Sequence, residues 1–299
     1  MTLPRLTFVG VATQDTIALV DRFPAPDERV LADKIVHTGG GPAATAAVTA
    51  ARLGMPTAFI GGVGDDETGE QVLAGLRTEG VDVSGVTVAR GQATATSVVV
   101  VTGATRAICN VPGPAAEIAA GSAAAEILDD AAWIHVDQVG WSAVELARKG
   151  GIGTRARLSV DGGNAIPGLR LDGVDLYVPT IAALAARYGN APLQDLLDAA
   201  LADGARTAVA TGGDQGAVAA SADGTHCAVP ALTADVVSTL GAGDVYHGAL
   251  LAAVARGYAL RDALAYAAAA AAASCEGLSG REAVPGHPAV LARAGIDHE

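Results

Sequence analysis

Short runs of β-branched residues alternate with helical segments of small residues along most of this chain. Because two parallel strands need a crossover that is usually a helix, the alternation indicates βαβ units on one sheet. The pattern predicts an α/β fold with a doubly wound, mostly parallel sheet flanked by helices. The segments are the strand Leu6–Val11, helix Pro42–Leu53, strand Thr57–Gly61, helix Glu67–Glu79, strand Trp133–Val136, helix Ala143–Lys149, strands Arg157–Val160 and Leu176–Val178, helix Leu193–Ala202 and strand Thr207–Ala210.

Two stretches break this alternation, Ile17–His37 and Val86–Asn110. Both are rich in strand-forming residues, and the second carries Gly103 between two such runs, which is typical of a hairpin. We predict that residues of about 13–37 and 88–110 form a small β lid over the carboxyl ends of the sheet strands. Open α/β sheets bind their ligands at that edge.

The core has to be built from small aliphatic residues, because 51% of the 299 residues are hydrophobic but only 3% are aromatic. Such residues suit helices packed closely on a parallel sheet. A chain of this length can bury one large core, so we predict a single domain over residues 1–299. The most apolar stretch, Ala263–Ala273, is too short to cross a bilayer and indicates a buried helix.

The charge of the chain argues against polyanionic partners. The net charge is −13, and the only lysines are Lys34 and Lys149, so nucleic acid and membrane surfaces are unfavourable partners. A phosphorylated ligand would instead need a few arginines, backbone amides, a helix N-terminus or a metal ion. The three cysteines have no metal-ligand spacing, and we expect a reduced, cytoplasmic protein.

The sharpest motif is Gly241-Ala242-Gly243-Asp244, which runs into a helical segment ending at Ala255. Small residues let backbone N–H groups converge on an anion, and a helix start adds positive potential. The motif therefore indicates a site for a phosphoryl group, beside which Asp244 can accept a proton from an attacking hydroxyl. Taken alone, an Asp that merely caps the helix is an equally good interpretation.

Two further glycine-rich segments fit either ligand contact or a simple turn. Gly39–Thr45 opens a helix and would bring a ligand close to backbone amides, although a tight strand-to-helix turn explains an isolated triple glycine better. Thr211–Gly216 follows a strand and either presents amides to phosphates or forms a hairpin turn. No Gly-Lys-Ser/Thr occurs, which excludes the usual phosphate loop. No histidine pair has metal-ligand spacing.

Taken in order, these motifs resemble those of the ribokinase-like sugar kinases, the PfkB family, over essentially the whole chain. The resemblance rests on the strand end at Gly10–Asp15, the signature around Gly40–Gly54, the turn Gly62–Gly69, Asp161 after a central strand, and the signature Gly241–Asp244. It implies a phosphotransferase that uses ATP and Mg²⁺ to phosphorylate a primary hydroxyl of a small sugar substrate.

The resemblance also implies a role for each matching residue. Asp244 would be the general base, with Gly241, Ala242 and Gly243 forming the anion hole. The sugar would contact Asp15, Arg29, Gly40, Gly41, Thr45, Asn110 and Asp161, and ATP would lie along Thr211, Gly213 and Gly216 and beside Ser274.

Within the family, three segments look closest to sulfofructose kinase and to ketohexokinase-like members: Gly39–Val48, Asp244–Leu250, and Cys275 with Gly280-Arg281. This narrower likeness implies a ketose acceptor, fructose-like and plain, sulfonated or phosphorylated. A homodimer joined through the lid is expected because unpaired strand edges seek partners.

The chain departs from the family pattern at three places. The Asn-x-x-Glu that organises Mg²⁺ falls on Thr180-Ile181-Ala182-Ala183, so the metal ligands stay unassigned. Ser238 stands where potassium-activated relatives have Asp, which leaves the use of a monovalent cation open, and Thr45 replaces an Asn. The alternatives are a catalytically weak sugar-binding or regulatory protein on the same fold and a nucleoside kinase.

Overall fold

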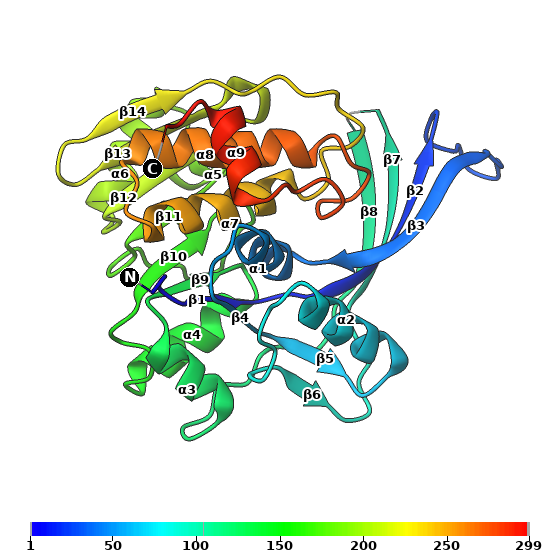
Figure 1. Cartoon of the computed structure of the whole chain (residues 1–299), viewed down its shortest axis with the longest axis horizontal. Coiled ribbons are helices and arrows are strands. Elements are labelled where there is room, and N and C mark those ends of the chain that lie inside the picture. The colour runs from blue at the N-terminus through cyan, green and yellow to red at the C-terminus, as the bar shows by residue number, and fades with distance from the viewer. Residues whose placement is uncertain (1, 104, 298–299) are drawn as a thin grey trace.

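The main sheet has the predicted doubly wound, mostly parallel architecture. The computed structural model describes residues 2–103 and 105–297 (Figure 1). The six strands from β12 to β4 run parallel, and β13 and β14 are antiparallel additions at one edge. In spatial order the strands are β14 (His226–Val229), β13 (Ala217–Ser221), β12 (Thr207–Thr211), β11 (Leu176–Val178), β10 (Arg157–Asp161), β9 (Trp133–Val136), β1 (Leu6–Val9) and β4 (Thr57–Ile60).

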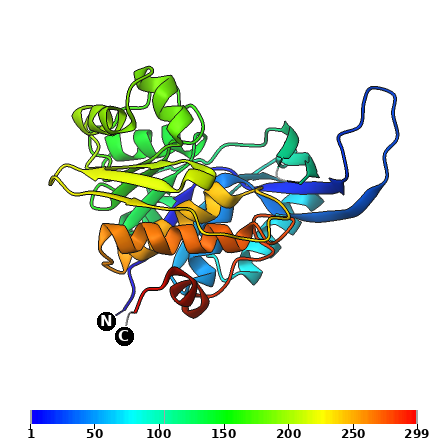
Figure 2. The same cartoon turned by 90° about the horizontal axis from the view of Figure 1, so that it is seen from above.

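Helices cover both faces of this sheet, because its central strands are apolar on both sides. Figure 2 shows the two helical layers with the sheet between them. One layer holds α1 (Pro42–Arg52), α2 (Glu67–Thr78), α7 (Ala242–Ala255), α8 (Leu260–Ser274) and α9 (His287–Ala294). The other holds α3 (Ala123–Asp130), α4 (Gly140–Lys149), α5 (Ile181–Tyr188) and α6 (Leu193–Ala202).

A second sheet stands at one end of the molecule, in the order β3-β2-β7-β8. Its strands are β2 (Thr13–Val20), β3 (Ala32–Gly40), β7 (Thr96–Thr102) and β8 (Thr105–Val111). The hairpin between β2 and β3 projects well beyond the body of the molecule (Figure 2). On its inner side Ile17, Val99 and Val101 pack with Leu278 and Leu240, which joins this sheet to the segment before α7. We call this four-stranded sheet the lid.

The strands of the lid differ from the predicted ranges in two respects. β3 continues three residues past His37 to Gly40, which brings it to the start of α1. Residues 88 and 89 belong instead to β6 (Thr87–Ala89), which pairs with β5 (Gly62–Gly64) in a separate two-stranded sheet. Among the described residues, no helix combines the length and apolarity that a membrane span requires.

Candidate active site

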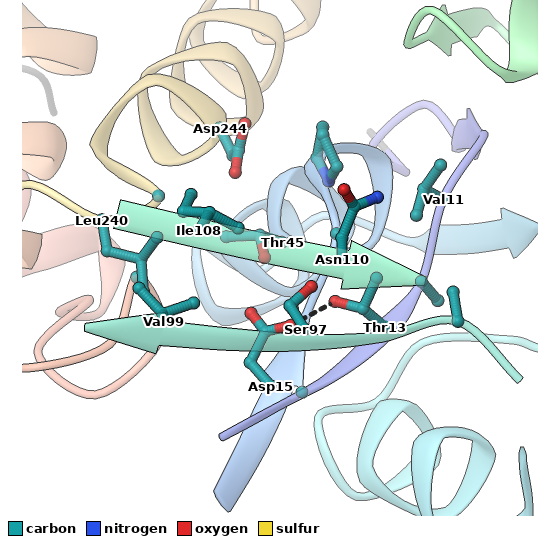
Figure 3. Close-up of a pocket in the computed structure, with 18 of the residues that line it drawn as sticks. Val11, Thr13, Asp15, Thr45, Ser97, Val99, Ile108, Asn110, Leu240 and Asp244 are labelled. Atoms are coloured by element: carbon teal, nitrogen blue, oxygen red, sulfur yellow. Dashed lines mark hydrogen bonds between the residues drawn. The ribbon is translucent and has the colours of Figure 1, made fainter. Parts of the chain in front are cut away.

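A cleft of about 600 Å³ lies between the inner face of the lid and the carboxyl ends of the main sheet. Figure 3 shows side chains from both sides pointing into it, with Asp244 above and Asp15 below. The lid contributes Asp15, Ile108 and Asn110, and the body contributes the loop before α1 and the first turn of α7. The structure therefore brings segments that are distant in the sequence together around one cleft.

Asp244 lies in the first turn of α7, where its half-buried side chain lines the cleft on the side of the main sheet. Burial raises the pKa of its carboxyl to about 8, and repulsion from Asp161 and Asp137 acts in the same direction. Arg281 and Arg106 oppose this shift with their positive charge. A carboxyl with this pKa is held near the protonation equilibrium that a general base needs at neutral pH.

The backbone around Asp244 fits a phosphoryl group. Gly241 precedes α7 in the left-handed region, with φ of 75°, and no side chain caps the helix start. A methyl group at Gly241 would lie 2.8 Å from the Cα atom of Gly280, whereas one at Gly243 would meet nothing within 4 Å. The first amides of α7 therefore face open space at the positive end of a helix, which is a site for anionic oxygens.

The end of the cleft opposite Asp244 is built around Asp15. Its carboxylate accepts a hydrogen bond of 2.6 Å from the Thr13 hydroxyl, and it lies so close to Gly40 that a side chain there would collide with it. Gly41 has φ of 89° and faces the carbonyl of Val11, so it also has to be glycine. The triple glycine thus serves both interpretations made from the sequence: it is a tight turn, and its residues line the cleft.

Arg281 is a buried cation directly behind the triple-glycine turn, and the sequence motifs gave it no role. Its guanidinium donates to the hydroxyl of Thr45 at 3.2 Å and to the carbonyl of Gly40 at 2.8 Å. Burial lowers the pKa of Arg281 to about 10, while the negative charges of Asp15, Glu79 and Asp244 oppose that shift. Arg281 therefore fixes Thr45, which lines the cleft, and stays charged at neutral pH.

Asp137 is a second residue that the motifs missed. This fully buried carboxylate accepts hydrogen bonds from the amides of Val11 (2.7 Å), Ala43 (3.3 Å), Val139 (2.9 Å) and Gly140 (2.9 Å). Burial raises the pKa of Asp137, against the effect of these bonds. One side chain thus joins the end of β1, the start of α1 and the start of α4.

Asp161 does not line the cleft, unlike the sugar contact that the resemblance implied. It is buried at the end of β10, where its carboxylate accepts from the amide of Gly163 at 2.8 Å and lies 3.5 Å from the Nδ1 atom of His247. His247 packs edge-on against His135, with ring centroids 5.4 Å apart. Asp161 therefore acts on the site through Asp244, whose ionisation it disfavours.

Two of the sugar contacts predicted from the lid, Asn110 and Arg29, are separated by the structure. Asn110 lies on the inner face of β8 and lines the cleft (Figure 3). Arg29 lies in the exposed connection between β2 and β3, away from the residues that line it. The side chain of Arg29 is therefore not brought to the site within one chain.

The predicted nucleotide residues lie outside the cleft. Thr211 ends β12 beside Thr180, and Gly213–Gln215 forms a short 3₁₀ turn before Gly216. Ser274 is buried near the end of α8, and its hydroxyl donates to the carbonyl of Ala271 at 2.8 Å. The adjacent Cys275 carbonyl accepts from the amides of Val237 and Ser238, which joins α8 to the segment that leads into α7.

The described residues contain no ligand cluster of the kind that binds a metal ion. Within residues 2–103 and 105–297, no three His, Cys, Asp or Glu side chains are grouped to hold a metal. Thr180, where the family has Asn, caps α5 by accepting from the amide of Ala183 at 3.0 Å. Mg²⁺ in kinases is usually held by one or two carboxylates together with substrate phosphates, so it does not require such a cluster.

Comparisons with known proteins agree with this geometry. Residues 4–286 match the pfkB family carbohydrate kinases. Fructokinase-1 of Zea mays is 30% identical over 243 residues, which are 71% of this chain and 72% of that protein. The chain spans only a quarter to a third of the length of several other curated relatives it matches.

Solved structures show the same fold. A putative ribokinase from Agrobacterium tumefaciens superposes with a TM-score of 0.86 and 26% identity, covering 98% of this chain and 97% of that one. Arabidopsis thaliana ribokinase complexed with ribose and ATP has a TM-score of 0.82 and 23% identity, covering 99% and 100%. The maize fructokinase supports the family, and neither it nor these two structures supports the narrower likeness to sulfofructose kinase or ketohexokinase. The chain belongs to the pfkB family of carbohydrate kinases.

Proposed function

We propose that this protein is an ATP-dependent carbohydrate kinase that phosphorylates a primary hydroxyl of a sugar, with Asp244 as the general base. The observation that carries the proposal is the placement of Asp244 beside the uncapped, glycine-lined start of α7, facing a cleft of sugar size. A carboxylate next to an anion-binding helix start can remove a proton while the same helix receives phosphoryl oxygens.

Each part of the cleft has a separate task in this reaction. Asp15, Gly41 and Asn110 hold sugar hydroxyls so that one of them faces Asp244. Asp244 takes the proton of that hydroxyl as its oxygen bonds to phosphorus. The amides of Gly243 and its neighbours in the first turn of α7 receive the oxygens of the transferred group.

The nucleotide would lie along Thr211, Gly213 and Gly216 and beside α8 near Ser274. Exposed Gly213 and the turn it opens leave backbone groups accessible there, in keeping with a bound phosphate or base. Bound ATP supplies the phosphoryl group, and Mg²⁺ neutralises charge on its phosphates. With the polar pair of the family replaced by Thr180 and Ala183, the chain itself contributes little to metal binding.

The acceptor we favour is a ketose of fructose type, plain or carrying an anionic substituent. Maize fructokinase-1 as a relative and Asn110 on the inner face of the lid support this choice. A catalytically weak sugar-binding protein is the second candidate, because Thr180 and Ala183 replace the metal-organising pair.

The test is an Asp244→Asn enzyme assayed with a panel of plain, sulfonated and phosphorylated ketoses, ribose and adenosine. We expect metal-dependent ADP release with a ketose by the native enzyme, and a loss of turnover on the order of a thousandfold or more in the variant. Nucleotide affinity, measured by calorimetry, should stay close to that of the native enzyme. Near-native turnover by Asp244→Asn would remove the base from the proposal, and sugar binding without turnover by the native enzyme would support the second candidate.

The lid also offers a surface for a second copy of this chain. On its outer face Ile35, Val98 and Val111 are 60%, 55% and 59% exposed, which leaves one side of the lid apolar and uncovered in the single chain. Covering such a face is favourable because apolar area is removed from water. A homodimer joined through the lid is therefore part of the proposal.

A further inference from the structure

Among the described residues that line the cleft, Arg106 is the single cationic side chain. The other charged groups of the lining are Asp15 and Asp244, and the whole chain carries a net charge of −13. A phosphoryl group that enters this cleft brings further negative charge. Some positive charge is needed there beyond the backbone amides, because repulsion between unscreened anions is costly in a closed site.

The position of Arg106 in the lid places it at the phosphoryl end of the cleft. Its guanidinium donates to the hydroxyl of Thr239 at 3.0 Å, across 133 residues of sequence. The carbonyl of the same Thr239 accepts the amide of Ala242, the first residue of α7. Arg106 is therefore attached to the turn that forms the anion hole.

The register of the lid separates Arg106 from the sugar end. Asn110 pairs with Ser97, and Ser97 pairs with Asp15, so these three residues lie in one row across the sheet. Arg106 is four positions before Asn110 on the same strand and pairs with Val101. At roughly 3.3 Å per residue, its row is about 13 Å from the row of Asp15. Arg106 is therefore separated from the row of Asp15 and Asn110 and lies beside Thr239, which belongs to the segment before α7.

We propose that Arg106 is a catalytic residue carried by the lid, whose guanidinium contacts the oxygens of the phosphoryl group during transfer. In that step the sugar oxygen bonds to phosphorus, the bond from phosphorus to the departing ADP oxygen breaks, and the proton goes to Asp244. Arg106 donates hydrogen bonds to the phosphoryl oxygens that carry the extra negative charge. Its hydrogen bond to Thr239 positions the lid against the start of α7. The inference rests on the proposed kinase reaction.

The role differs from that of the other arginines near the site. Arg281 is buried behind Gly40 with its donors directed at Thr45 and Gly40, so it does not reach the cleft. Arg29 lies on the projecting hairpin. With Thr180 and Ala183 in place of the polar pair of the family, the guanidinium of Arg106 supplies fixed positive charge at the phosphoryl end of the cleft.

The first arm of the test compares Arg106→Gln and Arg106→Lys with Arg90→Gln, a matched loss of one exposed arginine outside the cleft. We expect kcat of Arg106→Gln to fall about 100-fold or more relative to Arg90→Gln, with partial recovery in Arg106→Lys. The sugar KM should change little. Turnover equal to that of Arg90→Gln, or a raised KM with kcat preserved, would overturn the proposal in favour of no role or a sugar contact.

The second arm measures binding of ADP with aluminium fluoride, a mimic of the transferring phosphoryl group, by calorimetry. We expect native enzyme and Arg90→Gln to bind ADP with fluoride more tightly than ADP alone, and Arg106→Gln to lose that gain while its ADP affinity stays. An unchanged gain in Arg106→Gln overturns the proposal. This arm needs no acceptor, so it separates failure of the Arg106 role from failure of the sugar assignment, and thermal unfolding of each variant shows that it is folded.

Discussion

At the residue scale, Asp244 has to be ionised in surroundings that disfavour its charge. Burial and the nearby carboxyls of Asp161 and Asp137 raise its pKa to about 8, and the helix start and two arginines only partly offset this. The burial and charge repulsion that raise this pKa therefore also make the stability of the folded protein depend on pH.

Activity should rise with pH through the pKa of Asp244, because only its carboxylate form accepts the proton. We expect log kcat/KM to increase with a slope near one below a pH of about 8 and to level off above it. A steady-state profile between about pH 6 and pH 9 checks this. A flat profile over that range would contradict the assignment of Asp244 as the titrating base.

Stability should move in the opposite direction. The folded protein holds a proton on Asp244 up to a pH of about 8, whereas the unfolded chain releases it near the usual carboxyl pKa. Native stability from this group is therefore lost as pH rises toward 8. We expect Asp244→Asn to have a higher Tm than the native enzyme at pH 8, and a smaller advantage at pH 5, in buffers of equal ionic strength. An advantage that does not grow with pH would contradict the raised pKa.

The residues of the site differ in how far the sequence reveals them. Asp244 and Gly41 belong to local motifs, so their chemistry could be predicted before the fold was known. Arg281, Asp137 and Arg106 are single residues that also bond to groups 94 to 241 positions away, and no local sequence pattern predicts such long-range contacts. Arg29 is predicted as a sugar contact because its position in the sequence matches the family. Its side chain nevertheless lies away from the cleft.

At the scale of the element, the two glycines at the start of α7 have different roles, one in the backbone conformation and one in access to the helix start. Gly241 is required by the backbone, since it is left-handed and packed against Gly280. The fold does not require Gly243, because a Cβ atom there would meet no described atom within 4 Å. Under the proposed function, glycine at this position leaves room for the phosphoryl oxygens.

Two substitutions should separate these jobs. Gly241→Ala should lose about 1–2 kcal/mol or more of unfolding free energy, because an L residue is strained in that conformation. Gly243→Ala should be neutral or gain about 0.5–1 kcal/mol from helix propensity. Both should lower turnover, the second because its methyl enters the space for phosphoryl oxygens. Urea denaturation and kcat measured on the pair check this, and full turnover in Gly243→Ala would contradict the anion-hole geometry.

Most elements of the two sheets and their helices could be predicted from hydrophobic periodicity. Trp133–Val136, Leu176–Val178 and Leu193–Ala202 begin and end as predicted. α3, α5 and α9 were missed because each has only eight residues, too few turns for a clear period, and lies in a segment rich in alanine or broken by proline.

At the scale of the whole molecule, the lid has an apolar outer face that the rest of the described chain leaves exposed. Val98→Asp should convert a dimer into a monomer, because it places charge in the centre of that face, on a central strand of the lid. Val88→Asp is the matched control, since Val88 is 53% exposed but lies in the separate β5–β6 sheet. Light scattering after size exclusion gives both masses. A monomeric native protein, or a dimeric Val98→Asp, would contradict the proposed interface.

The carboxylate of Asp137 has a consequence for how such an enzyme can diversify. This buried group accepts hydrogen bonds from amides at the end of β1, the start of α1 and the start of α4. A buried side chain therefore holds the backbone of this part of the cleft in place. The backbone pairing of β8 with β7 does not depend on the side chains, so those of β8 other than Arg106 can change one by one. Evolution can therefore change the side chains with which the lid faces the cleft while the backbone turns held by Asp137 stay in place.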